Sequence, residues 1–246
     1  MTASTAVVLV AALIAILSML VFAAAFQHGY RDQDAERKGA RFLGSGTFLV
    51  HWFMWALRPL ERILLRLGAT PDHLNVGGLL FGLASAVAIG TGRLEAAGWA
   101  IVLAGACDVL DGRLARELHT ASPYGKFIDS TLDRFVETFA FLGFAVYYAH
   151  WPGGPLIVAA GLGGSLLVSY AQARGESVGV TGSGGLMQRA ERLVLTLLGC
   201  LFDPALSRAL ARREGTFLLA ILALIAIGAF ITAAHRTFWI ARRLRQ

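Results

Sequence analysis

Residues 108–133 read DVLDGRLARELHTASPYGKFIDSTLD, and this stretch places four aspartates within or beside apolar runs of the chain. Asp108 and Asp111 are three residues apart, and Asp129 and Asp133 are four residues apart. On an α-helix either spacing puts the paired side chains on one face, so two neighbouring helices could direct four carboxylates at one point. A carboxylate inside a membrane helix costs about 2.5 to 3.5 kcal/mol, so such a cluster needs a compensating cation.

The chemistry of these side chains indicates which cation they bind. Oxygen ligands without histidine or cysteine favour Mg²⁺, Mn²⁺ or Ca²⁺ over zinc, and four carboxylates can hold two ions about 3.5 to 4 Å apart. A site with two ions suits attack at a phosphorus centre. Gly112 and Ala115 leave room for a ligand against the helix backbone, and Gly125 opens the next segment. Arg116 would then neutralise a carboxylate or bind a diphosphate oxygen.

Two other interpretations of the acidic residues stay open at this point. The chain could be a non-enzymatic transporter or channel whose carboxylates form an ion path through the membrane. Alternatively, Arg113, Arg116 and Arg134 could pair with the aspartates in a packing arrangement that carries no chemistry.

The composition indicates that lipid surrounds most of the chain. Of its 246 residues, 56% are hydrophobic and 15% are charged, compared with about 25% charged residues in soluble domains. The formal charge is +6, but the arginines are scattered between apolar segments. This distribution argues against nucleic acid and favours anionic lipid headgroups and phosphorylated substrates. Cys107 and Cys200 lie in apolar runs, and we interpret them as packing residues.

The N-terminal region contains a candidate membrane span and a candidate interfacial helix. Residues 5–26 are 22 uncharged and mainly apolar residues, enough to cross a hydrocarbon core of about 30 Å. A signal peptide is the alternative, although no Lys or Arg precedes the run. After a charged connector at residues 27–46, arginines recur every four residues beside aromatic residues in 48–67, which is typical of a helix lying in the membrane interface. Pro59 should interrupt or kink this helix, or begin a second helical piece.

Further apolar segments follow, separated by short Gly-rich or Pro-rich breaks, at residues 73–91, 94–114, 127–149, 155–174, 186–202 and 216–239. The predicted fold class is therefore all-α, a polytopic membrane helix bundle. We divide it into an N-terminal span with its connector (1–46), an interfacial amphipathic helix (47–72) and a six-helix transmembrane domain that carries the aspartates (73–246).

Positive residues predict the orientation of this bundle in the cell membrane. Arginine and lysine concentrate in alternate breaks, which places the loop from Arg113 to Lys126 in the cytoplasm. Arg208, Arg212 and Arg213 violate this alternation.

The four aspartates belong to a longer pattern. Residues 108–133 fit D-x2-D-G-x2-A-R-x8-G-x3-D-x3-D at every fixed position, and this pattern resembles the signature of CDP-alcohol phosphotransferases. The resemblance implies that Asp108, Asp111 and Asp129 bind metal, and that Asp133 binds metal and also accepts the proton of the attacking hydroxyl. It further implies two Mg²⁺ ions, with Mn²⁺ as the alternative ion, CDP-diacylglycerol as the donor, release of CMP, and a homodimer.

Further residues correspond to the family's CDP-lipid site. Gly112 and Arg116 match nucleotide and diphosphate contacts, and Ser122 falls where relatives often carry a hydroxyl residue. Residues 70–75 (TPDHLN) resemble the family's T-P-[ND]-x-x-T segment, which borders the same site. Asn75 replaces the usual threonine, although an amide can take its place as a hydrogen-bonding group. The residues assigned to CDP-lipid binding are Asp72, His73, Leu74, Asn75, Gly112, Arg116 and Ser122.

The second half of the chain resembles one subfamily, the phosphatidylinositol-phosphate synthases. Residues 169–176 (SYAQARGE) and 185–193 (GLMQRAERL) are similar to its S-Y-x-K-A-R-A-E and G-x-x-x-R-P-E-R-L, and His235-Arg236 matches its Q-R pair. The resemblance implies that inositol phosphate is the acceptor and that Arg192 and Arg236 bind its phosphate. We assign Arg174 to the same phosphate.

The identity of the acceptor stays open in one respect, because Gln172 stands where the subfamily has lysine. Arginines suit a dianionic acceptor because bidentate pairs with phosphate are strong. The alternative is that they anchor the protein at the membrane surface. Glycerol 3-phosphate, serine or another alcohol therefore also stays open as acceptor.

Overall fold

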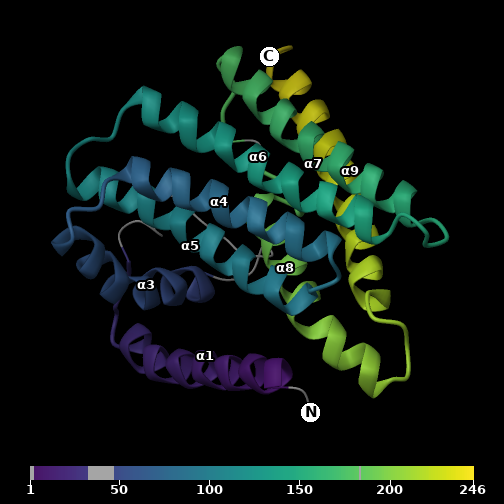
Figure 1. Ribbon diagram of the computed structural model, residues 1–246. Helices are drawn as coiled ribbons and strands as arrows, with labels where there is room; N and C mark the ends of the chain where they lie inside the picture. Colours follow the sequence, from purple (N-terminus) through teal and green to yellow (C-terminus); the bar gives the residue numbers. More distant parts are fainter. Residues whose placement is uncertain (1–2, 33–46, 183) are drawn as a thin grey trace. The chain divides into compact units, whose positions relative to one another are not determined.

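The structure of the chain is a computed structural model that describes residues 3–32, 47–182 and 184–246 (Figure 1). Within these residues it contains eight α-helices and no β-strand. The helices are α1 (Ala3–Gln27), α3 (Phe48–Arg66), α4 (Pro71–Gly90), α5 (Leu94–Glu117), α6 (Pro123–Tyr147), α7 (Gly154–Ser177), α8 (Arg189–Ala209) and α9 (Thr216–Arg243). The predicted all-α fold class is confirmed, whereas most of the charged connector at 27–46 lies outside the described residues.

The helices follow the apolar segments of the sequence closely. Helices α4 to α9 correspond one for one to the six segments predicted after residue 72. Helix α3 continues through Pro59, so the predicted interruption of this helix is wrong. A proline inside a helix removes one backbone hydrogen bond, and the packing of α3 described below offsets that loss.

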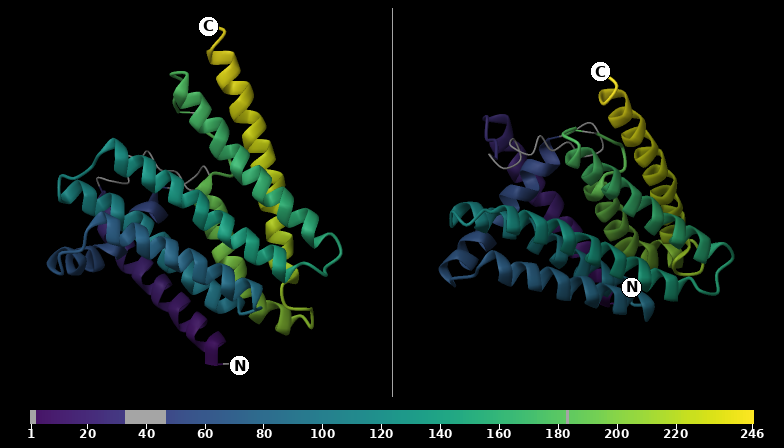
Figure 2. Two further views of the ribbon diagram at one scale, coloured as in Figure 1. Left: turned by 45° about the horizontal axis from the view of Figure 1, so that its top comes forward. Right: turned by 90° about the horizontal axis from the view of Figure 1, so that it is seen from above.

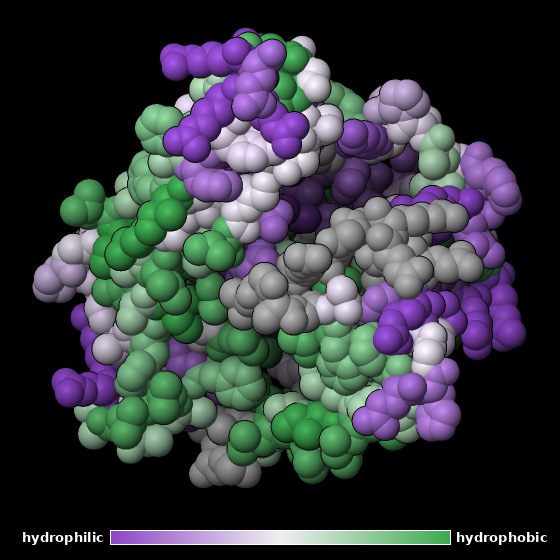
Figure 3. All heavy atoms as spheres, turned by 180° about the vertical axis from the view of Figure 1, so that it is seen from behind, coloured by the Kyte–Doolittle hydropathy of each residue, from purple (hydrophilic) through white to green (hydrophobic). Residues whose placement is uncertain are grey.

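Several helices expose apolar side chains that a water-soluble protein would bury. Helices α1, α4, α7 and α9 are long and apolar enough to cross a membrane. On α1, Ile14, Leu20 and Val21 are 61%, 65% and 64% exposed, and apolar surface covers broad areas of the face in Figure 3. Exposure of this extent indicates a membrane protein. Helices α5, α6 and α8 have 24, 25 and 21 residues, but their charged residues make them less apolar.

The contacts divide the chain into two compact units, of which the first comprises residues 1–81 and 102–133. In its described part, α1 packs against α3 through aromatic rings, with the ring centres of Phe22 and Trp55 5.5 Å apart. The indole N–H of Trp52 donates to the Ser18 hydroxyl over 3.0 Å. Aromatic residues of the candidate interfacial helix therefore contact the N-terminal helix.

The second unit comprises residues 82–101 and 134–246. Its helices α7 and α9 run side by side in both views of Figure 2. A Cβ atom on Gly164 would lie 2.9 Å from that of Ala229, so the absence of a side chain at Gly164 permits this close approach.

Charged residues of α8 and of the turn that follows it organise one end of the second unit. The buried Asp203 carboxylate accepts the backbone N–H groups of Phe217 and Leu218 over 2.9 and 3.0 Å, which caps the first turn of α9. Arg208 lies 3.4 Å from Glu95. The Arg213 guanidinium lies 4.2 Å from the centre of the Trp151 ring. These contacts give Arg208 and Arg213, which violate the alternation of positive charge, a structural role within the unit.

Candidate active site

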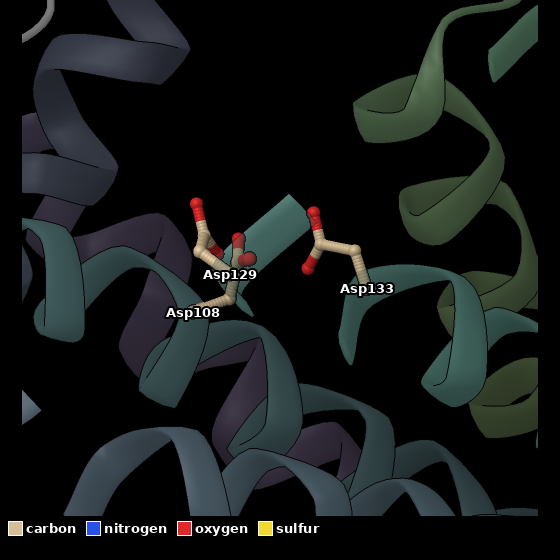
Figure 4. A group of neighbouring side chains, drawn as sticks. All are labelled: Asp108, Asp129 and Asp133. Atoms are coloured by element: carbon tan, nitrogen blue, oxygen red, sulfur yellow. The ribbon is translucent and has the colours of Figure 1, made fainter. Parts of the chain in front are cut away.

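Three of the four predicted metal ligands converge in the first unit. Asp108 comes from α5, and Asp129 and Asp133 come from successive turns of α6 (Figure 4). One carboxylate oxygen from each lies within 4.8 Å of the other two, and all three residues are half-buried. The i, i+4 spacing on α6 and the neighbouring helix α5 thus produce the cluster that the sequence predicts.

Close packing of α4 on α5 fixes the position of the first aspartate. A Cβ atom on Gly77 would lie 3.5 Å from the Cys107 sulfur, and one on Gly78 would lie 3.4 Å from the Cys107 Cβ. Leu74 and Leu110 are buried in one small apolar cluster beside these glycines. Residues 71–75 therefore form the first turns of the helix that packs on α5 beside Asp108.

Asp111 follows Asp108 by one turn of α5 and is 5% exposed. Its carboxylate is not among the three that converge within 4.8 Å in the described residues. Its assignment as a metal ligand stays a prediction.

The predicted small residue and cation of the motif lie together on α5. A Cβ atom on Gly112 would lie 3.3 Å from a terminal nitrogen of Arg116. The Arg116 side chain therefore folds back over Gly112, and a larger residue at 112 would displace it. The absence of a side chain at Gly112 thus leaves space for the guanidinium in this position.

The other residues assigned to the CDP-lipid site lie at helix N-termini. Ser122 precedes α6, and its hydroxyl accepts the backbone N–H of Gly125 over 3.1 Å. Thr70 precedes α4 and forms a reciprocal pair with His73, in which the Thr70 N–H donates to His73 Nδ1 over 3.2 Å and the His73 N–H donates to the Thr70 hydroxyl over 3.4 Å. Asp72 lies in the same first turn, and Asn75 is half-buried one position after Leu74.

The buried Arg113 has acidic partners outside the metal cluster. Its guanidinium contacts Glu61 of α3 at 2.8 Å and Asp32, which follows α1, at 3.5 Å. The alternative in which Arg113, Arg116 and Arg134 pair with the motif aspartates stays a hypothesis, because the described acidic partners of Arg113 are Asp32 and Glu61, which lie outside the motif.

The predicted acceptor arginines lie in the second unit. Arg192 is 2% exposed and forms a bidentate pair with Glu137 of α6, at 2.7 and 3.0 Å. Arg236 is 3% exposed and donates to Gln172 Oε1 over 2.9 Å and to the Val168 carbonyl over 3.0 Å. Glu137 was missed in the sequence, although its position one turn after Asp133 was a usable signal.

One loop joins these two arginines. Arg236 donates to the Gly184 carbonyl over 3.1 Å, and Arg192 donates to the Met187 carbonyl over 3.1 Å. The Met187 N–H in turn donates to Thr232 of α9 over 3.0 Å. Arg174 is exposed, and its described contact is with Ser177 of its own helix at 3.4 Å. The structure therefore brings Arg192 and Arg236 to one loop and does not show Arg174 joining them.

The carboxylate cluster fits a divalent ion by donor type and by spacing. Opposite ligands of Mg²⁺ at about 2.1 Å from the ion are about 4.2 Å apart. A spread within 4.8 Å is close to that value, so small side-chain rotations suffice. The three oxygen donors are also those that Mg²⁺ and Mn²⁺ prefer.

Known proteins with similar sequences share this motif-bearing region. The family model for CDP-alcohol phosphatidyltransferase matches residues 68–241. A phosphatidylinositol phosphate synthase from Mycobacteroides abscessus is 31% identical over 187 residues, which cover 74% of this chain and 85% of the relative. One from Streptomyces avermitilis is 33% identical over 196 residues, covering 78% and 80% of the two chains.

Solved structures resemble the chain as well. The crystal structure of Mycobacterium tuberculosis phosphatidylinositol phosphate synthase with bound CDP-DAG matches with a TM-score of 0.64 and 28% identity, covering 74% of this chain and 92% of that one. Its complex with manganese and citrate matches with a TM-score of 0.66 and 29% identity, covering 74% and 88%.

The chain belongs to the CDP-alcohol phosphatidyltransferase family. It is a membrane enzyme, a transferase of phospholipid biosynthesis, and three of its aspartates form a cluster that could hold a divalent metal ion.

Proposed function

We propose that this enzyme transfers the phosphatidyl group of CDP-diacylglycerol to a hydroxyl of inositol phosphate and releases CMP. The observation that carries the proposal is the convergence of Asp108, Asp129 and Asp133 within 4.8 Å, on the signature motif of the family. The two phosphatidylinositol phosphate synthases named above align over 85% and 80% of their length. That similarity favours inositol phosphate over glycerol 3-phosphate or serine as the acceptor.

Asp133 has the central role among the protein groups. The acceptor oxygen forms a bond to the phosphorus that carries diacylglycerol, the bond between the two phosphates breaks, and CMP leaves with the bridging oxygen. Asp133 takes the proton of the acceptor hydroxyl. General-base assistance of this kind contributes about 10²- to 10⁴-fold to the rate.

The remaining motif residues bind and orient the donor. Asp108, Asp111 and Asp129, with Asp133, would hold two Mg²⁺ ions, or Mn²⁺ in their place. When bound, the ions offset negative charge on the diphosphate and on the leaving phosphate. Arg116, which folds over Gly112, binds a diphosphate oxygen. The N-terminal ends of α4 and α6 border the cytidine of the donor, through Asp72, His73, Leu74, Asn75 and Ser122.

Arg192 and Arg236 provide positive charge for the phosphate of the acceptor, but we expect them to attract it to different extents. Glu137 offsets the charge of Arg192 through its bidentate pair. The described partners of Arg236 are neutral oxygens of Gln172 and of backbone carbonyls. We therefore expect Arg236 to attract the phosphate more strongly, and Arg192 to orient it. Arg174 is a third, exposed contact in this proposal.

A CMP-release assay with purified protein tests the proposal. With CDP-diacylglycerol and Mg²⁺ or Mn²⁺, inositol phosphate should produce CMP in proportion to the phospholipid product, and unphosphorylated inositol should produce much less. Glycerol 3-phosphate and serine complete the acceptor panel. If a different acceptor gives the highest kcat/KM, the acceptor assignment is wrong. If no alcohol yields CMP, the proposed transfer from CDP-diacylglycerol is wrong.

We also propose that the enzyme is a homodimer in the cell membrane. Each chain comprises an N-terminal segment (1–46), an interfacial helix (47–72) and a transmembrane domain (73–246), and its metal site faces the cytoplasm. A cysteine at Thr120, after α5, should then be protected from an impermeant thiol reagent in intact cells. A cysteine at Thr91, after α4, should react, because the two exposed turns flank one predicted span. The native Cys107 and Cys200 are replaced beforehand. Reaction at Thr120 with protection at Thr91 would reverse the proposed orientation.

A further inference from the structure

The N-terminal segment lies outside the region that the family model matches, which begins at residue 68. A buried group of charges nevertheless joins this segment to the helix that carries Asp108 and Asp111. Asp32, which follows α1, is 1% exposed, and Arg113 of α5 is 6% exposed. Buried charges at a junction between segments indicate a specific attachment, since each must be compensated there.

The Arg113 guanidinium is held by groups that precede the family region. Its Nε donates to Glu61 Oε2 over 2.8 Å, and one terminal nitrogen is also 2.8 Å from the same oxygen. The other terminal nitrogen lies 3.5 Å from Asp32 Oδ2 and donates to the Met54 carbonyl over 3.3 Å. These contacts fix both the position and the plane of the guanidinium.

Asp32 is itself held in place by α3. Arg58 donates to its carboxylate over 3.3 Å, and the Asp32 backbone N–H donates to Nδ1 of the buried His51 over 2.8 Å. Together Asp32, Glu61, Arg58 and Arg113 carry two negative and two positive charges. We refer to these four residues as the N-terminal charge cluster.

Arg113 joins α5 to the other residues of the N-terminal charge cluster, and it lies on the face of α5 opposite Asp108 and Asp111. At 100° per residue, Asp108 and Asp111 are about 60° apart around the helix, and Arg113 is about 170° from the midpoint between them. Helix α5 therefore presents carboxylates on one face and is held by Arg113 on the other. A carboxylate about 6 Å from the helix axis moves by about 1 Å when the helix rotates by about 10°.

We propose that Asp32 is a positioning residue for the metal centre, acting through Arg113 to fix the rotation of α5 and hence the direction of the Asp108 and Asp111 carboxylates. The inference rests on the proposed function in so far as these carboxylates bind the divalent ion. It assigns the N-terminal segment a role in the chemistry of the family domain. A displacement of about 1 Å at a site of this kind costs up to about 100-fold in activity.

The test is Asp32→Asn, which keeps the shape of the side chain and removes its charge. Electron paramagnetic resonance of Mn²⁺ added to the purified protein measures binding without reference to turnover. We expect the Mn²⁺ dissociation constant to rise about 5- to 20-fold, and the Mn²⁺ concentration for half-maximal CMP release to rise in parallel. The KM for CDP-diacylglycerol at saturating Mn²⁺ should change less than twofold. Asp32→Glu should recover part of the Mn²⁺ affinity, because it restores the charge.

Glu95→Gln is the matched control. Glu95 also lies on α5 and pairs with an arginine, Arg208, at 3.4 Å, but it is 13 positions before Asp108, about 20 Å along the helix. The Glu95→Gln substitution should leave Mn²⁺ binding unchanged. Thermal unfolding in detergent shows whether Asp32→Asn and Glu95→Gln are equally folded. A double variant separates direct from indirect action: if Asp32 acts through Arg113, adding Asp32→Asn to Arg113→Gln causes no further loss.

Several results would overturn the inference. The first is a wild-type Mn²⁺ affinity in folded Asp32→Asn. The second is an equal loss of Mn²⁺ affinity in Glu95→Gln. The third is a double variant whose loss of Mn²⁺ affinity equals the sum of the losses in Asp32→Asn and Arg113→Gln. Failure of Mn²⁺ to bind the wild-type protein would remove its premise. If the wild-type protein binds Mn²⁺ but releases no CMP, the proposed function is wrong, while the binding comparison still decides the role of Asp32.

Discussion

Asp133→Asn should lower the turnover of CDP-diacylglycerol and acceptor by at least about 100-fold, and by up to about 10⁴-fold, at saturating Mg²⁺. The amide keeps the size of the carboxylate but cannot take a proton from the acceptor hydroxyl. Asp133 is half-buried and lies with Asp108 and Asp129 within 4.8 Å, so its loss also removes one ligand from the centre. Initial rates of CMP release measure the effect.

Comparison with the other aspartates separates the base from the ligands. Asp108→Asn and Asp129→Asn should weaken Mn²⁺ binding, and raising the metal concentration should recover part of their activity. Asp133→Asn should still bind some Mn²⁺, and excess metal should not restore its turnover. Glu95→Gln alters a carboxylate on α5 that lies 13 positions before Asp108 and outside the cluster, and it serves as a control. Wild-type turnover by Asp133→Asn in saturating Mg²⁺ would exclude Asp133 as the base.

The carboxylate cluster was predictable from the sequence because local geometry determines much of it. The i, i+3 and i, i+4 spacings place the paired aspartates on single faces of α5 and α6. Helical periodicity is a property of short stretches of sequence. The apolar runs likewise predicted helices α4 to α9, because their hydropathy depends only on neighbouring residues.

The charge partners were not predictable, because they depend on which distant residues pack together. Arg113 contacts Asp32 and Glu61, which are 81 and 52 positions away along the chain. Arg192 pairs with Glu137, 55 positions away. Pro59 is a different case. The low preference of proline for helix interiors predicted an interruption of α3, and tertiary packing overrode that preference.

Arg236→Gln should raise the KM for inositol phosphate about 10- to 150-fold. A charge-assisted hydrogen bond to phosphate contributes about 1.5 to 3 kcal/mol, which corresponds to that range. Arg236 is the better position for this test than Arg192. Removing Arg192 would leave the Glu137 carboxylate buried without its bidentate partner, at a cost of about 3 to 5 kcal/mol in stability. The KM for CDP-diacylglycerol should change little, and steady-state kinetics with each substrate varied in turn measures both.

Gln172→Lys supplies the complementary change at the same place. Gln172 accepts a hydrogen bond from Arg236 over 2.9 Å, and its amide nitrogen donates to Glu176 over 3.1 Å. A lysine there can pair with Glu176 and adds a cation beside Arg236, so it should lower the KM for a dianionic acceptor and leave that for neutral inositol unchanged. Arg174→Gln tests whether the exposed third arginine contributes. If inositol or serine is the better substrate and Arg236→Gln keeps the normal acceptor KM, the assignment of Arg236 to the acceptor phosphate is wrong, because only a phosphate-bearing acceptor would respond to the loss of the buried Arg236 cation or to a cation added at the exposed position 172.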